Sequence, residues 1–176
     1  MSGPLIIVTA AFLIPLAFII SYYDIYYRRI PNTFVLTTLA VGVVLNVSFG
    51  GLNGAVASLG GCALGFFLMF VLHIFGAMGA GDVKLFAAIA SVTGVHLVLP
   101  MFFVVILTGG VLGVVAMLRA GQIKSTMMRV LSILFGVLPG HSVPRFAIPA
   151  DRKHTIPYGV AITFGSLLSL VLFRAW

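Results

Sequence analysis

Long runs of apolar residues, separated by short polar or glycine-rich breaks, dominate this chain. Several runs approach 20 residues, which matches the thickness of the hydrocarbon core of a bilayer. Lipid admits only helices or closed barrels, and these runs lack the two-residue alternation of barrel strands. The pattern therefore predicts helices at residues 5–27, 33–49, 55–75, 82–93, 97–118 and 156–173. We expect an all-α, polytopic membrane protein with about six transmembrane helices and a single domain over residues 1–176.

The breaks between the runs carry signals for turns and kinks. Pro15 predicts a kink inside the first helix, and Pro31 suits the first turn of the second helix, where its missing N–H is not needed. Residues 50–54, Gly-Gly-Leu-Asn-Gly, predict a turn. Small residues in the third run, which would let a neighbouring helix approach closely, are Gly60, Gly61 and Gly65.

Composition supports lipid as the surrounding solvent. Of 176 residues, 61% are hydrophobic and 7% are charged, whereas about 25% is usual for soluble domains. The net charge is +7. In a membrane protein the first explanation for an excess of basic residues is that they keep loops on the cytoplasmic side, so no nucleic-acid partner is expected. With the N-terminus outside, nine of the ten basic residues fall on the cytoplasmic side, and only Arg174 falls on the other. The nine are Arg28, Arg29, Lys84, Arg119, Lys124, Arg129, Arg145, Arg152 and Lys153.

The basic segment 119–154 contains an apolar run at 130–139 that is too short to span a bilayer. This run either lies on or dips into the membrane surface, or packs on the bundle as a loop helix, and the sequence favours neither. The segment could attract anionic membrane lipids or simply enforce topology. Cys62 is a lone cysteine inside an apolar run, and four scattered histidines show no metal-ligand spacing. We therefore expect no metal and no cofactor.

Two of the three acidic residues are candidates for chemistry. Asp151 lies in the basic segment, where solvation or a surface ion pair explains it, whereas Asp24 and Asp82 lie near helix ends at similar membrane depth. A charge at membrane depth costs about 2.5–3.5 kcal/mol and usually marks a functional site. Two adjacent carboxyl groups share one proton, so one can deprotonate water while the other donates to a substrate carbonyl. A catalytic aspartate pair is therefore predicted.

Neighbouring residues fit this prediction, but structural roles remain open. Gly79 and Gly81 would let an extended substrate backbone approach Asp82, whose position at a helix start favours its ionised form. Alternatively, Asp82 is an N-cap and Asp24 pairs with Arg28 one helical turn later. Lys84 could tune the pair or contact substrate, or it could be a snorkelling topology anchor.

The motif at residues 79–84, Gly-Ala-Gly-Asp-Val-Lys, resembles the Gly-x-Gly-Asp-x-Lys signature of type IV prepilin peptidases, which are intramembrane aspartic proteases. Two more stretches resemble family landmarks: residues 29–32, Arg-Ile-Pro-Asn, which follow Asp24, and residues 156–161, Ile-Pro-Tyr-Gly-Val-Ala, which open the last helix. These features occur in the family's order, and the resemblance covers essentially the whole chain.

The resemblance implies that Asp24 and Asp82 are the catalytic pair and that basic leaders of prepilin substrates are cut at the cytoplasmic face of the bacterial inner membrane. It also implies that Pro31, Asn32, Pro157 and Tyr158 shape the site. Longer members carry a paired-cysteine region and also N-methylate the new terminus, whereas only a tight connection follows the first helix here. The expected activity is therefore peptidase without methyltransferase, as in enzymes for Flp-type pilins. A preflagellin peptidase of archaeal type is the second alternative within the family.

Two other classes of function remain as alternatives. A proton-coupled transporter also uses intramembrane acids and broken helices. Against it, the two halves show no inverted repeat, and no second broken segment mirrors residues 76–82. A non-catalytic scaffold of a secretion machine has no reason to keep two acids at the membrane boundary.

Overall fold

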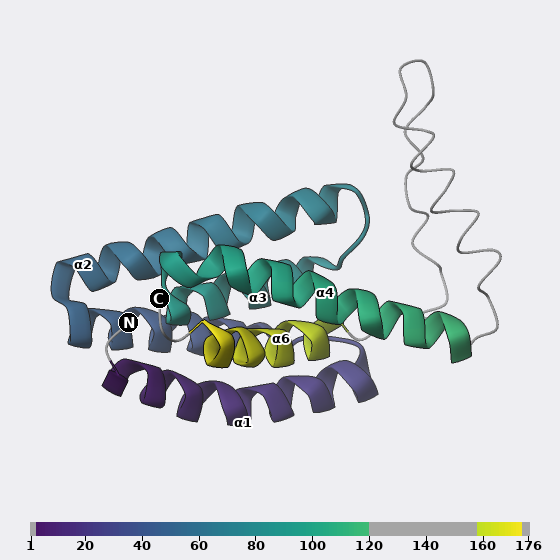
Figure 1. The fold of residues 1–176 in the computed structure, drawn as a ribbon, viewed down its shortest axis with the longest axis horizontal. Coiled ribbons are helices and arrows are strands. Elements are labelled where there is room, and N and C mark those ends of the chain that lie inside the picture. Colours follow the sequence, from purple (N-terminus) through teal and green to yellow (C-terminus); the bar gives the residue numbers. More distant parts are fainter. Residues whose placement is uncertain (1–2, 120–157, 174–176) are drawn as a thin grey trace, which may run out of the picture.

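The computed structural model describes residues 3–119 and 158–173, and those residues form helices and connections without a strand. The helices are α1 (Gly3–Tyr27), α2 (Asn32–Ile74), α3 (Ala80–Thr93), α4 (Val95–Arg119) and α6 (Tyr158–Leu172). They pack side by side as a bundle (Figure 1). The all-α prediction is thus confirmed, whereas the predictions for the basic segment beyond residue 119 and for Pro157 lie outside the described residues.

The long helix α2 reverses direction at Gly51. Gly42 and Gly61 both lie against the C-terminal end of α3, although an uninterrupted helix would separate them by about 28 Å. Gly51 lies between them with φ 56° and ψ −135°, a conformation that residues with a side chain rarely adopt. The two halves of α2 correspond to the two helices predicted at 33–49 and 55–75, and Figure 1 shows the reversal. The predicted turn is confirmed, although helix continues closer to Gly51 on both sides.

The outer surface of the bundle is apolar. Leu52 is 82% exposed, Ile7 71% and Leu107 70%. Apolar side chains this exposed, in this number, indicate lipid and not water as the solvent. By length and hydropathy, α1, α2 and residues 95–115 of α4 can each cross a membrane, whereas α3 has 14 residues and α6 has 15. The chain is a membrane protein, and the count of six spans stays a prediction.

The short helix α3 lies at the centre of the bundle. Residues 85–94 are all buried, and the backbones of α2 and α3 approach closely where α2 carries glycine. A Cβ atom at Gly61 would collide with the Ala90 carbonyl oxygen, and one at Gly65 would lie 2.7 Å from the Ala90 Cβ. Gly60 differs, because a Cβ there would meet Val95 at an ordinary 3.8 Å. The predicted close approach is therefore confirmed for Gly61 and Gly65 only.

Asn46 closes the C-terminal end of α3. Its Nδ2 donates to the carbonyl oxygens of Ser91 and Val92, both at 3.0 Å, and to that of Gly42 in its own helix at 2.9 Å. The last carbonyls of a helix have no partner within that helix, and lipid supplies none. The buried amide of Asn46 therefore fixes where α3 ends relative to the first half of α2.

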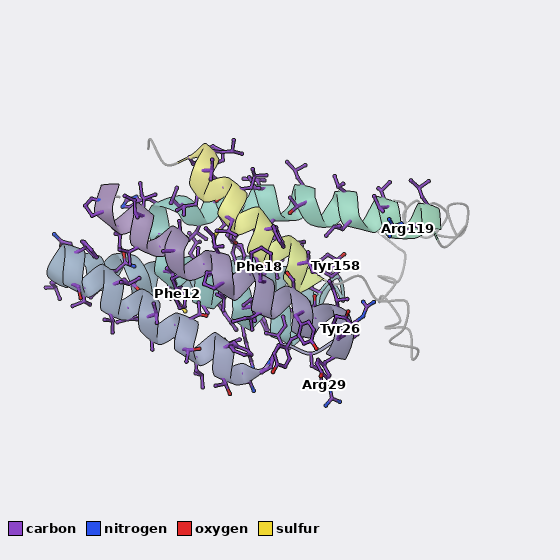
Figure 2. The ribbon with its side chains drawn as sticks, turned by 90° about the horizontal axis from the view of Figure 1, so that it is seen from below. Phe12, Phe18, Tyr26, Arg29, Arg119 and Tyr158 are labelled. Atoms are coloured by element: carbon purple, nitrogen blue, oxygen red, sulfur yellow. The ribbon has the colours of Figure 1, made fainter. Side chains whose placement is uncertain are left out.

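Successive helical segments along the chain alternate in direction (Figure 1). One end of the bundle therefore gathers the ends of α1 and α4, both ends of α2, and the starts of α3 and α6. We call it the aspartate end. Tyr26, Arg29, Tyr158 and Arg119 lie toward this end in Figure 2. The basic residues among the described ranges all belong to it; they are Arg28, Arg29, Lys84 and Arg119. Pro15, predicted as a kink, does not interrupt α1.

Candidate active site

Asp24 lies in the last turn of α1, on the face that packs into the bundle. Leu13, Ala17, Ile20 and Asp24 recur at helical spacing and are all buried, so the same periodicity that builds the core carries the carboxyl group inward. The side chain is 8% exposed. Its Oδ2 accepts a hydrogen bond of 2.7 Å from the backbone N–H of Gly159. A costly buried acid is thus placed against the start of α6.

Gly159 is one of two candidate site residues that sequence reasoning missed. A Cβ atom there would lie 2.9 Å from Asp24 Oδ2 and 3.1 Å from Asp24 Cγ, closer than real side chains approach. The Ile-Pro-Tyr-Gly stretch was recognised as opening the last helix, but its glycine was not assigned to the site. Nothing in the local sequence identifies a partner that lies 135 residues away.

Asp82 lies in the first turn of α3, which begins at Ala80, two residues before the predicted start. Its Oδ2 accepts a hydrogen bond of 3.1 Å from the Gly79 N–H. Asp82 therefore does cap the helix, but from the third helical position and not as the N-cap residue, which is Gly79. This bond gives the Gly79 N–H a hydrogen-bond partner and leaves Oδ1 of Asp82 available for another interaction.

The structure brings the two aspartates into one electrostatic cluster. The carboxyl group of Asp82 interacts electrostatically with the carboxyl group of Asp24 and with the His73 side chain. It also interacts electrostatically with the Tyr158 hydroxyl. His73 lies in the last turn of α2, where its Nδ1 lies 2.8 Å from the Met78 carbonyl oxygen. Sequence reasoning left His73 out because it has no metal-ligand spacing. Arg28 acts electrostatically on Asp24, which supports the alternative in which these two residues pair. This interaction does not exclude a pair formed by Asp24 and Asp82.

Two of the predicted supporting residues lie where α1 connects to α2. Pro31 is the N-cap of α2, so it lies one position before the helix and not, as predicted, in its first turn. Asn32 is the first helical residue, and its side chain is exposed. The connection between α1 and α2 lies over the start of α3, because a Cβ at Gly81 would meet the Ile30 side chain at 3.7 Å. That is ordinary contact, so access for a substrate backbone at Gly81 stays a prediction.

Tyr158 and Lys84 differ in how they relate to the bundle. The ring of Tyr158 packs on α4, where a Cβ at Gly109 would lie 3.3 Å from it. Lys84 is exposed and makes no hydrogen bond or ion pair with any described residue. Its two predicted roles therefore remain open.

A cavity of about 850 Å³ lies at the opposite end of the bundle. Its lining includes Leu5, Asn46, Asn53 and His96, none of which belongs to the aspartate cluster. Over the described ranges, no three His, Cys, Asp or Glu side chains gather in a way that could hold a metal ion. Two carboxyl groups that influence each other electrostatically favour a state in which one of them is protonated.

Comparison with known proteins adds a family to this geometry. The pattern of the Type IV leader peptidase family matches residues 11–114, a range that includes both aspartates but not Gly159. A "Prepilin leader peptidase/N-methyltransferase" of Bacillus subtilis (strain 168) is 34% identical over 120 residues, which are 65% of this chain and 47% of that protein. The chain thus spans about half the length of this relative, and no solved structure matches. Because the family pattern covers more than half of the chain, the chain belongs to the Type IV leader peptidase family.

Proposed function

We propose that this chain is an intramembrane aspartic endopeptidase that removes the leader peptide from type IV prepilin-like proteins. The supporting observation is that Asp24 and Asp82 lie at the same end of the bundle and interact electrostatically, in a member of the Type IV leader peptidase family. The reaction needs only these two side chains and a water molecule. One carboxylate takes a proton from water as the oxygen attacks the peptide carbonyl carbon. The other carboxyl group donates its proton to the carbonyl oxygen. When the C–N bond breaks, the leaving amine takes the proton held by the first aspartate, and a hydroxyl group of the intermediate returns a proton to the second, so that a carboxylic acid and an amine are released.

The proposed place of cleavage is the cytoplasmic face of the bacterial inner membrane. Arg29 and Arg119 lie toward the same end as the aspartates (Figure 2). Basic residues next to spanning helices are retained on the cytoplasmic side. Cleavage on this side would also leave the hydrophobic part of a substrate beside the helices and its polar leader in water.

The proposed activity stops at hydrolysis. The relative from Bacillus subtilis carries both peptidase and N-methyltransferase in its name, but α1 and α2 of this chain are joined by residues 28–31 alone. That connection leaves no room for a paired-cysteine insertion. We further propose Flp-type prepilins as substrates, in keeping with the compact form. The mass of the new N-terminal peptide tests the first point, because N-methylation would add 14 Da.

Replacement of each aspartate tests the proposed reaction. The chain is co-expressed with candidate prepilins, and the N-terminus of any processed product is sequenced. We expect Asp24→Asn and Asp82→Asn each to abolish processing while the protein stays in the membrane, and Asp151→Asn to process normally. Asparagine keeps the shape of the side chain but cannot exchange a proton. Full processing by the Asp82→Asn variant would refute the aspartic mechanism.

A further inference from the structure

The start of α6 meets Asp24 directly. The Gly159 N–H donates to Asp24 Oδ2 at 2.7 Å. The first N–H groups of a helix have no partner within the helix, and its positive end favours an anion. Asp82 receives one N–H bond at 3.1 Å from Gly79. The shorter bond at Asp24 favours the carboxylate form there over the carboxylate form at Asp82.

Space, as well as hydrogen bonding, ties Gly159 to Asp24. A Cβ at this position would lie 2.9, 3.1 and 3.2 Å from three atoms of the Asp24 side chain. Asp24 is itself buried, so its carboxyl group has little room to move aside. Only a residue without a side chain lets α6 start this close to the carboxyl group.

We propose that Gly159 is a positioning residue that holds Asp24 as the base of the aspartate pair. The inference rests on the proposed function. The Gly159 N–H occupies Oδ2, which leaves Oδ1 as the oxygen that takes the proton from water. Asp82 then supplies the proton to the substrate carbonyl. In this role Gly159 acts through Asp24.

The sequence offers a measurement that needs no substrate. Gly159 is the one glycine among 20 that follows a tyrosine. Labelling with 13C-carbonyl tyrosine and 15N-glycine therefore selects a single amide in an HNCO spectrum of the detergent-solubilised full chain. A hydrogen bond to a carboxylate deshields an amide proton, so Asp24→Asn should move the Gly159 proton strongly upfield. Asp82→Asn is the control and should move this signal much less. An equal or smaller response to Asp24→Asn would overturn the proposal.

A pair of glycine variants on α6 provides the second measurement. Gly159→Ala adds a methyl group beside Asp24, whereas Gly165→Ala adds one against Thr108 and Val105 of α4 at similar distances of 2.8 and 2.9 Å. We expect both variants to lower thermal stability, but only Gly159→Ala to lower kcat for prepilin cleavage, by roughly 100-fold, since misplacing a reacting group by about 1 Å has effects of this size. KM should change little in either variant. Wild-type kcat in a folded Gly159→Ala variant would overturn the proposal.

The two measurements separate this inference from the proposed function. A wild-type chain that cleaves no prepilin would refute the peptidase, yet the Gly159 amide would still report whether Asp24 is its acceptor. If Gly159→Ala does not fold, the amide measurement decides, because it uses the natural glycine. If the Gly159 proton ignores Asp24→Asn while the wild type cleaves prepilin, the peptidase stands and the positioning role falls.

Discussion

The reversal of α2 at Gly51 can be tested with two adjacent glycines. Gly51 has φ 56° and ψ −135°, whereas Gly50 has helical backbone geometry. A Cβ at either position would meet no atom within 4 Å. The effects of alanine at the two positions should therefore differ only through the backbone conformation, because neither methyl group meets another atom. Gly51→Ala is the perturbation, and Gly50→Ala is its matched control.

The expected magnitudes follow from the backbone angles. A non-glycine residue in such a sparsely populated region costs about 1–3 kcal/mol. Alanine also lowers the entropy of the unfolded chain, which returns about 0.4–1 kcal/mol. Gly51→Ala should thus lower the free energy of unfolding by about 1–2 kcal/mol. Gly50→Ala should raise it by up to about 1 kcal/mol, because alanine is the better helix former.

Reversible unfolding in mixed detergent micelles, followed by circular dichroism, measures both free energies. The comparison between neighbours removes differences in detergent binding and in helix content. A Gly51→Ala variant as stable as the Gly50→Ala variant would show that α2 does not turn at this residue. The contact of both halves of α2 with the C-terminal end of α3 would then need another explanation.

Further substitutions test the packing and the surface. Asn46→Leu should lower the free energy of unfolding by roughly 1–3 kcal/mol, because two carbonyls of α3 lose their donor, whereas Asn53→Leu on the exposed turn should change it little. Phe86→Ala empties a fully buried site and should lower the free energy of unfolding by about 3–5 kcal/mol, while Phe103→Ala, which is 62% exposed, serves as control. Lys84→Met should change the free energy of unfolding by less than about 0.5 kcal/mol. Any loss of prepilin cleavage by that variant would therefore come from the reaction and not from unfolding.

The helices were predictable because lipid enforces them. Apolar runs of about 20 residues must satisfy their backbone internally, so α1 and the two halves of α2 follow from hydropathy. The boundaries were harder, because local bonds decide them. The start of α3 at Ala80 depends on the Gly79 N–H reaching Asp82, and its end depends on Asn46 from a distant helix. A pattern of apolar residues contains neither bond.

The candidate site was predictable to the extent that charge is costly in lipid. Asp24 and Asp82 stood out because acids at membrane depth are rare and expensive. Gly159 and His73 did not stand out, since glycines are common in spanning helices and a lone histidine is usually structural. Their part in the site appears only when α6 and the end of α2 are placed beside the aspartates. Long-range packing, and not local sequence, makes them site residues.

The two aspartates face opposite electrostatic situations within their own helices. Asp82 lies at the N-terminal end of α3, where the helix dipole favours an anion, whereas Asp24 lies in the last turn of α1, where the dipole of its own helix opposes one. The start of α6 reverses this at Asp24 by aiming a second helix N-terminus at the same carboxyl group. Such a contribution is worth about 0.3–2 kcal/mol, so it offsets only part of the cost of about 2.5–3.5 kcal/mol for a charge at membrane depth. In the proposed mechanism, moving the start of α6 away from α1 would therefore remove a stabilising contribution from the carboxylate form of Asp24 and so weaken the proposed base.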